Sequence, residues 1–310
     1  MNIFIAKSLY GEFSSPEKKY LSKKLKGHRI FIEGSNKTLN NKILKSCEVI
    51  FGNLNPELLN EAPSLKWIQL ESAGFAEYQD CIQFNKFLKI SNLKDFFSDQ
   101  VAHTAVASIL SFYRKIPTLS LLQEKKKWVG DPLRKQLETV TGKNILFIGS
   151  GYINKRIKKL LAGFDCVFEF TNSQTPKGKL KKLIKQSEIV ICCTPGTPKT
   201  NNLLNKDLLN QFRKNSLLVN IGRGNAIDEK QLIHILQKKK ILGAILDVTN
   251  QEPIPQNHPL WTLNNVLLTQ HTAGGSQDEL LKKIDFFKNN LDRYLKNKKP
   301  LNLVNFKRGY

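Results

Sequence analysis

The sequence predicts an α/β protein with two domains: a Rossmann-type, doubly wound parallel sheet and a smaller flavodoxin-like α/β unit. Three observations predict this fold class. Short apolar runs alternate with polar helical stretches in two series, one ending near residue 95 and one beginning near residue 144. A glycine-rich turn closes the first strand of the second series. The length of 310 residues is enough for two domains of ordinary size.

The first series contains five strand-like runs, at residues 3–6, 29–32, 48–51, 66–70 and 88–90. Helical patterns lie between them at 16–25, 38–46 and 75–82. This alternation is typical of a parallel sheet with helical crossovers. A longer helix is expected from about 98 to 115, where one face carries the apolar side chains of Val101, Ala105, Ile109 and Phe112.

The second series contains six strand-like runs, at residues 144–148, 166–170, 189–193, 216–220, 241–246 and 266–268. Helices are expected in the intervals, which gives the pattern of a doubly wound dinucleotide-binding domain. A final helix at about 277–296 is long enough to return to the first domain.

The composition favours a globular protein of the cytoplasm, with 40% hydrophobic and 24% charged residues. No apolar run approaches the roughly 20 residues of a membrane span. The N-terminus lacks the charged segment and cleavage site of a secretory signal. The five cysteines are odd in number and form no C-x-x-C pair, so we expect reduced, buried thiols and neither disulfides nor a metal site.

The net charge of +23 raises the question of nucleic-acid binding. A nucleic-acid surface is typically focused on one face and includes arginines and aromatic residues. Here lysine outnumbers arginine about five to one, and the lysines are scattered along the chain. The pattern therefore indicates solvated helix faces, and nucleic acid is an unlikely partner. A positive field of this size also attracts anionic cofactors and keto acids.

Three residues in the last third of the chain carry the chemistry. Arg223 lies in the run Asn-Ile-Gly-Arg-Gly, Glu252 in Gln-Glu-Pro, and His271 in Thr-Gln-His-Thr-Ala-Gly. A guanidinium can hold a carboxylate bidentately and polarise a carbonyl. An imidazole can transfer a proton near neutral pH, and a carboxylate beside it fixes its orientation. These are the residue types that hydride transfer to a 2-keto acid requires.

The motifs and their order resemble those of the D-2-hydroxyacid dehydrogenase family over nearly the whole chain. Arg223 and Glu252 are 29 residues apart (252 − 223), and Glu252 and His271 are 19 apart (271 − 252). The run His-Pro-Leu-Trp at 258–261 and the tail at 290–304 also look like the family's. The resemblance implies a discontinuous substrate domain at 1–97 with 288–310, and an NAD(P)-binding domain at 98–287. Trp261 is expected to be a core or dimer-contact residue rather than part of the active-site wall.

The turn Gly149-Ser150-Gly151 lies where a strand meets a helix, as in a dinucleotide-binding fingerprint. Gly149 permits the tight turn, and Gly151 lets the backbone approach a pyrophosphate at the helix N-terminus. The third glycine of the fingerprint is replaced by Asn154, whose side chain is expected to loosen or shift the packing between helix and sheet.

The end of the next strand also departs from the pattern for NAD. Phe170 stands where Asp or Glu binds the ribose hydroxyls, followed by Thr171, Asn172 and Ser173. Without a carboxylate there, the sequence favours NADP(H) over NAD(H), although a register slip of one residue would bring Glu169 to this position. By resemblance, the other residues expected to contact the cofactor are Tyr152, Ile153, Thr194, Pro195, Thr200, Ile221, Gly222, Asp247 and Gly274.

The run Glu71-Ser72-Ala73-Gly74 follows a strand and resembles the family's substrate loop. Its backbone N–H groups, at Ser72, Ala73 and Gly74, would receive the substrate carboxylate. Family members specific for phosphoglycerate carry arginine at the position of Ser72, so a non-phosphorylated substrate is expected.

The sequence therefore predicts an NAD(P)-dependent enzyme that interconverts a small 2-keto acid and its D-2-hydroxy acid, with Arg223, Glu252 and His271 as catalytic residues. The family resemblance implies a homodimer built around the helix at 98–115. The alternative is a catalytically weak dinucleotide-binding regulatory or interaction protein on the same scaffold. Asn154 and Phe170 favour that alternative, whereas the intact Arg/Glu/His set opposes it.

Overall fold

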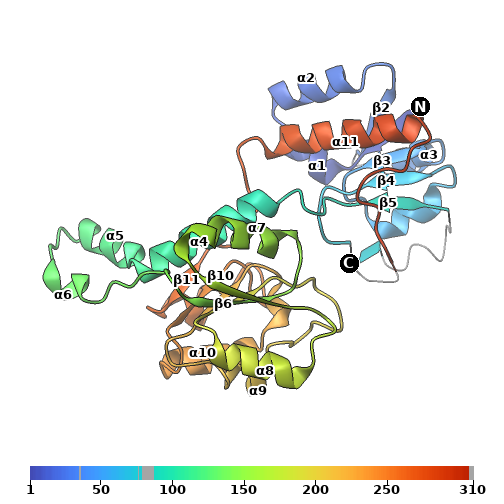
Figure 1. Cartoon of the computed structure of the whole chain (residues 1–310). Coiled ribbons are helices and arrows are strands. Elements are labelled where there is room, and N and C mark those ends of the chain that lie inside the picture. The colour runs from blue at the N-terminus through green and yellow to red at the C-terminus, as the bar shows by residue number, and fades with distance from the viewer. Residues whose placement is uncertain (35, 76, 79–86, 307–310) are drawn as a thin grey trace. The chain divides into compact units, whose positions relative to one another are not determined.

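The computed structural model describes residues 1–34, 36–75, 77–78 and 87–306 (Figure 1). The chain divides into two compact units, Met1–Phe96 with Ser276–Tyr310 and Phe97–Gly275. Within the described ranges, no helix is both long enough and apolar enough to span a membrane.

The first unit contains a five-stranded parallel sheet in the order β2-β1-β3-β4-β5. Its strands are β1 (Asn2–Ile5), β2 (Arg29–Ile32), β3 (Val49–Phe51), β4 (Trp67–Gln69) and β5 (Lys89–Ser91). Its helices are α1 (Lys7–Glu12), α2 (Ser15–Lys24), α3 (Lys37–Leu44), the 3-10 helix η1 (Pro56–Glu61) and α11 (Glu279–Leu295). Helices cover both faces, which gives a separate apolar core on each side of the sheet.

Helix α11 completes the core on one face of this sheet. The Phe287 ring is fully buried and stacks on Phe51 with their centroids 4.1 Å apart, and Trp67 lies 5.6 Å away on the same side. Figure 1 shows α11 beside α2, and the Tyr20 hydroxyl donates to Asp285 across that contact at 2.9 Å. Because α11 packs here along its length, the chain rejoins this unit at Ser276, whereas the sequence placed the return at residue 288.

The second unit contains a six-stranded parallel sheet in the order β11-β10-β9-β8-β6-β7. Its strands are β6 (Asn144–Ile148), β7 (Val167–Thr171), β8 (Ile189–Cys192), β9 (Leu217–Asn220), β10 (Gly243–Leu246) and β11 (Val266–Leu268). Its helices are α4 (Ser98–Tyr113), α5 (Ile116–Glu124), α6 (Asp131–Arg134), α7 (Tyr152–Leu161), α8 (Lys177–Gln186), α9 (Lys206–Leu209) and α10 (Glu229–Gln237), with the 3-10 helices η3 (Ala162–Phe164), η4 (Gly224–Ala226) and η5 (Pro259–Trp261).

The apolar cores on the two faces of this sheet hold its helices in place. Helices α4 and α7 cover one face, and α8, α9 and α10 cover the other. The strand order reverses between β6 and β8, because β7 pairs on the far side of β6. In open α/β sheets such a switch point, at the carboxyl ends of the strands, is where ligands bind.

The predicted fold class is confirmed, since both sheets are parallel and carry helices on their two faces. Each strand predicted from an apolar run appears within two residues of its expected bounds, as do the helices expected at 16–25, 38–46, 98–115 and 277–296. The helix expected at 75–82 falls largely outside the described residues. Helix α1 and helices α5 and α6 were not foreseen, because they are short or expose their apolar side chains.

Phe287→Ala is expected to lower the free energy of unfolding by about 3–5 kcal/mol, because it leaves a cavity between two stacked aromatic rings. Leu281→Ala on the same helix is the matched control, since this side chain is 37% exposed. Urea denaturation of both variants, followed by tryptophan fluorescence, measures the difference. Equal midpoints for the two variants would contradict the packing described for α11.

Candidate active site

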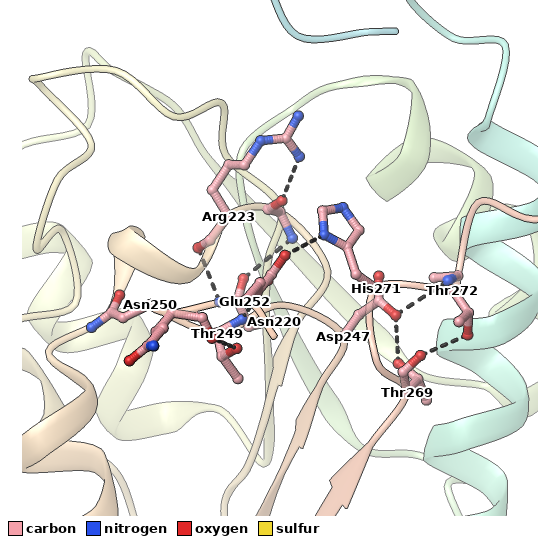
Figure 2. Close-up of polar contacts among 12 residues, drawn as sticks. Asn220, Arg223, Asp247, Thr249, Asn250, Glu252, Thr269, His271 and Thr272 are labelled. Atoms are coloured by element: carbon pink, nitrogen blue, oxygen red, sulfur yellow. Dashed lines mark hydrogen bonds and ion pairs between the residues drawn. The ribbon is translucent and has the colours of Figure 1, made fainter. Parts of the chain in front are cut away.

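Arg223, Glu252 and His271 emerge from three adjacent strands of the second unit. Arg223 follows β9, Glu252 lies in the loop after β10, and His271 follows β11. Residues Asn220, Leu246 and Leu268 are paired in register across these strands. Because parallel strands end at the same edge of a sheet, the three side chains are brought together there, as Figure 2 shows.

The imidazole of His271 is paired with the carboxylate of Glu252. Nδ1 of His271 lies 2.5 Å from Oε2 of Glu252. The other carboxylate oxygen, Oε1, accepts a hydrogen bond from the Thr249 backbone N–H at 2.8 Å. Both carboxylate oxygens are therefore engaged, which fixes the carboxylate and, through it, the plane of the imidazole. Nε2 of His271 forms no hydrogen bond within the described part of the chain, so it is available to a substrate.

The backbone at His271 is held in an unusual conformation by Asp247. Gln270 and His271 both have left-handed φ values, 53° and 56°. Such values are uncommon for residues other than glycine and persist where surrounding contacts impose them. The Asp247 carbonyl accepts from the His271 N–H at 2.6 Å. Its buried carboxylate oxygen Oδ1 accepts from the Thr269 hydroxyl at 2.6 Å and the Ala273 N–H at 3.2 Å. Asp247 thus anchors the turn that presents the imidazole.

Because Oδ1 of Asp247 is occupied, a contact from this residue to a nicotinamide amide would have to use Oδ2. The role assigned to Asp247 from the family resemblance stays a prediction. Its anchoring of the His271 turn, by contrast, was not foreseen from the sequence.

The loop that carries Arg223 is organised by Asn220, which the sequence reasoning did not single out. The Asn220 side chain is buried, with Nδ2 donating to the Arg223 carbonyl at 3.1 Å and Oδ1 accepting from the Gly222 N–H at 3.2 Å. Nη1 of Arg223 donates to the Gly222 carbonyl at 2.8 Å, and the Arg223 side chain is exposed. An asparagine at the end of a buried strand was the only sequence signal for this role.

Gly224 lets the loops of Arg223 and Glu252 approach each other. A Cβ at this position would lie 1.9 Å from the carbonyl oxygen of Thr249, whose N–H donates to Glu252. No side chain fits there unless the loop around Glu252 moves. The spacing between Arg223 and the Glu252–His271 pair therefore depends on this glycine.

A cavity of about 420 Å³ lies beside the Glu252–His271 pair. Its lining is largely apolar, with Leu246, Pro253, Ile254, Trp261 and Leu268 as its apolar members. Trp261 is 45% exposed, and its indole N–H donates to the Pro255 carbonyl at 3.0 Å. It is therefore not a core residue, contrary to one of the two expectations. Trp261 lines this cavity together with Pro253 and Ile254 of the loop after β10.

The turn after β6 has the geometry to receive a phosphate. Gly149 has a φ of 103°, and a Cβ on it would lie 2.5 Å from the Cys193 carbonyl oxygen. Gly151, the N-cap of α7, has no side chain with which to cap the helix. Helix α7 is ten residues long and begins at Tyr152, so the positive end of its dipole faces this turn, a setting that fits a pyrophosphate.

The residues at the end of β7 are only partly placed as the sequence predicted. Thr171 was expected to contact the cofactor, but it is buried and its hydroxyl donates to the Phe147 carbonyl at 3.3 Å. Phe170 stacks on Phe147 with centroids 4.6 Å apart. Asn172 is exposed, and its Oδ1 accepts from the Gln174 N–H at 2.9 Å. Of Thr171 and Asn172, therefore, only Asn172 exposes its side chain to solvent.

The remaining residues expected to contact the cofactor lie at the same edge of the sheet. Thr200 braces its own loop, because its hydroxyl donates to the Pro195 carbonyl and accepts from the Thr197 N–H at 2.9 Å. Thr194, Ile221 and Gly222 are buried, and a Cβ on Gly274 would contact the Phe97 ring. Burial at this edge raises the pKa of Cys192 to about 11 and of Cys193 to about 12, so both remain neutral thiols.

The loop at 72–74 belongs to the first unit, and all three of its carbonyls are engaged. The Ser72 carbonyl accepts from the Leu93 N–H at 2.9 Å, that of Ala73 from the Asn92 side chain at 2.7 Å, and that of Gly74 from the Ser72 hydroxyl at 2.7 Å. Within the described ranges, the N–H groups of these three residues donate to no acceptor. The loop therefore has unused N–H donors among the described residues, as an anion-binding turn requires.

Comparison with known proteins identifies the relatives of this chain. Residues 106–273 match the family described as D-isomer specific 2-hydroxyacid dehydrogenase, NAD binding domain. The chain belongs to the D-isomer specific 2-hydroxyacid dehydrogenase family. It is therefore related to oxidoreductases, and its second unit includes the family's NAD-binding domain.

Relatives in the family match most of the chain. A glyoxylate/hydroxypyruvate reductase of Arabidopsis thaliana is 29% identical over 267 residues, covering 83% of this chain and 82% of the relative. A glyoxylate reductase of Thermofilum pendens is 29% identical over 272 residues, covering 81% and 78%. An acyclic imino acid reductase, solved with NADPH and D-Arg, is 22% identical with a TM-score of 0.81 and covers 98% of this chain and 100% of that one. This last likeness shows the fold.

Gly224→Ala is expected to lower kcat/KM with a keto acid by about 100-fold, because displacing a reacting group by about an ångström has an effect of that size. Gly178→Ala in α8 is the matched control, since a Cβ there meets nothing within 4 Å. Steady-state rates at the reduced-nicotinamide absorbance band measure both. Equal rates for the two variants would contradict the close approach of the two loops.

Proposed function

We propose that this protein is an NAD(P)-dependent enzyme that interconverts a small, non-phosphorylated 2-keto acid and its D-2-hydroxy acid. The observation that carries the proposal is the hydrogen-bonded Glu252–His271 pair at the sheet edge that also bears Arg223. The relatives named as glyoxylate/hydroxypyruvate reductase and glyoxylate reductase support the same class of substrate. We also propose that the enzyme forms a homodimer and acts in the cytoplasm.

In the proposed reduction, Arg223 binds the keto acid through its exposed guanidinium. Its planar donors suit the carboxylate, and a second N–H polarises the ketone oxygen, where negative charge develops. The dinucleotide, when bound, supplies the hydride that reduces the carbonyl carbon. His271 donates a proton from Nε2 to the same oxygen, so the product leaves as a neutral alcohol. Glu252 holds Nδ1 throughout and stabilises the protonated ring before transfer.

The loop at 72–74 is proposed to bind the substrate carboxylate, on the basis of its own geometry. Its three N–H groups, which donate to no acceptor among the described residues, offer partial positive charge without a cationic side chain. Ser72 is neutral and its hydroxyl is committed to the Gly74 carbonyl. Residues 71–74 include no cationic side chain to pair with the second negative charge of a phosphate, so a carboxylate is the expected guest.

We also propose that the enzyme prefers NADP(H). Residues 170–173 at the end of β7 contain no carboxylate, and Lys177 and Lys179 are exposed on the helix that follows. Glu169 lies within β7, opposite Leu146 and two residues before the strand end, where it is poorly placed for a ribose contact. The absence of a negative charge leaves room for a 2′-phosphate.

The alternative of a weak dinucleotide-binding regulatory protein rested partly on Asn154. In the structure Asn154 is fully buried and hydrogen-bonded to the Gly149 carbonyl, so it does not disrupt the turn at 149–151. The ordered support of Glu252 and His271 is also more than binding alone requires. These contacts favour the enzyme over the binding protein.

His271→Ala is expected to lower kcat by about 10²–10⁴-fold, the usual contribution of a positioned acid. Arg223→Lys is expected to lower kcat by a similar factor, because an ammonium group cannot form the two parallel hydrogen bonds of a planar guanidinium. Rates are measured with glyoxylate, hydroxypyruvate, pyruvate, 2-oxobutyrate and phenylpyruvate. His234→Ala, an exposed histidine on α10, is the matched control. Near-wild-type turnover in His271→Ala or Arg223→Lys would remove that residue from the scheme.

The wild-type enzyme is expected to show a lower KM for NADPH than for NADH. Asn172→Asp should reduce that preference at least about tenfold, because the new carboxylate repels the 2′-phosphate. The two KM values are compared with one keto acid at saturation, and Asn201→Asp serves as a control for the added charge. A strong wild-type preference for NADH would refute the proposed preference.

A further inference from the structure

Asn154 takes the place of the third glycine in the dinucleotide-binding fingerprint. It lies in the first turn of α7, and its side chain is 0% exposed. The expected loosening between helix and strand is not what the structure shows. The side chain instead fills the space and forms hydrogen bonds to the turn that precedes the helix.

The amide of Asn154 joins α7 to the last strand residue and the turn. Its Nδ2 donates to the Gly149 carbonyl at 2.7 Å and reaches the Ile148 carbonyl at 3.3 Å. Because both neighbours are acceptors, the amide must present nitrogen to them. Its Oδ1 is buried and accepts no hydrogen bond from the described residues. The side chain is therefore held by its donor end alone.

These bonds fix the direction of the peptide that follows Gly149. The Gly149 N–H donates to the Thr171 carbonyl at 3.0 Å, and its own carbonyl is bound by Asn154. In a trans peptide the carbonyl and the next N–H point in opposite directions. The Ser150 N–H is thus directed away from the Asn154 amide. Glycine at 149, with its φ of 103°, would otherwise allow this peptide to rotate.

We propose that Asn154 is a positioning residue for dinucleotide binding, which sets the Gly149–Ser150 peptide in the orientation that receives the pyrophosphate. This role rests on the proposed function, in which a dinucleotide binds at this turn. A glycine at position 154 acts by allowing the helix close to the strand. Here a side-chain amide holds the same turn by hydrogen bonds, so the substitution preorganises the site rather than weakening it.

The test compares Asn154→Gly, which restores the fingerprint, with Asn154→Leu, which keeps a similar volume without the amide. Dissociation constants for NADPH and NADH are measured by quenching of protein fluorescence, without any keto acid. Both variants should bind the preferred dinucleotide at least about tenfold more weakly, a change of about 1.4 kcal/mol. At saturating dinucleotide, kcat should remain within about threefold of wild type, because Asn154 contacts no reacting group.

Asn290→Leu is the matched control. Asn290 is also 0% exposed, and its Nδ2 donates to Gln69 at 2.8 Å and to the Leu301 carbonyl at 3.2 Å, within the other unit. This variant should lose thermal stability while its dinucleotide affinity stays unchanged. Equal weakening in Asn290→Leu would reduce the effect at Asn154 to general destabilisation and overturn the proposal.

Asn154→Gly is the decisive variant, because it separates a positioning role from simple tolerance of asparagine. Affinity equal to or tighter than wild type in Asn154→Gly would overturn the proposal and leave the proposed function intact. A fall in kcat at saturation with no change in affinity would also overturn it. Wild-type protein that binds neither dinucleotide would defeat the proposed function together with this inference.

Discussion

The register of β9, β10 and β11 is the constraint on which the candidate site depends. The pairing of Asn220 with Leu246 and of Leu246 with Leu268 ends the three strands in one row. Arg223, Glu252 and His271 leave this row in three separate loops. A slip of one residue in either pairing would move each side chain to the opposite face of the sheet and shift one loop away from the others. The packing that fixes the register of these strands therefore also fixes where the three loops begin.

Buried asparagines reinforce the loops that the strand ends release. Asn220 binds the loop of Arg223, Asn92 binds the turn at 72–74, and Asn154 binds the turn at Gly149. An amide carries donors and acceptors together, so it can hold backbone groups that regular structure leaves unpaired. Asn290 does the same between α11 and the chain at Leu301. These four asparagines therefore each stabilise a segment of backbone through their side-chain amides.

Much of the fold could be predicted from the sequence, because apolar runs of strand length alternate with helical periods. The grouping of Arg223, Glu252 and His271 was expected from their residue types and from motifs whose order and spacing resemble those of the family. The direction of individual side chains could not be predicted. Thr171 points into the sheet because its place in β7 turns it away from solvent, and no motif records that. Trp261 is half exposed and lines a cavity, although its apolar ring favoured a buried position.

The anchoring of the His271 turn by Asp247 was equally hidden, since it depends on φ values and a carbonyl that no residue pattern specifies. The boundary where the chain returns to the first unit was expected at residue 288. It lies at Ser276, because the whole of α11 packs in the first unit. Both cases concern contacts between segments far apart in sequence. Local periodicity carries information about elements, and it does not determine which surface each element covers.

The loop at 72–74 has one consequence for selectivity. Each of its three carbonyls accepts a hydrogen bond from a described residue, whereas its N–H groups donate to none of them, so the loop offers an anion three unused donors. The backbone N–H groups do not titrate, so their affinity for an anion does not change as the solution is acidified until the anion itself takes up a proton. The pH dependence of binding at this turn is therefore set by the pKa of the bound acid, because the N–H donors of the protein are the same at every pH.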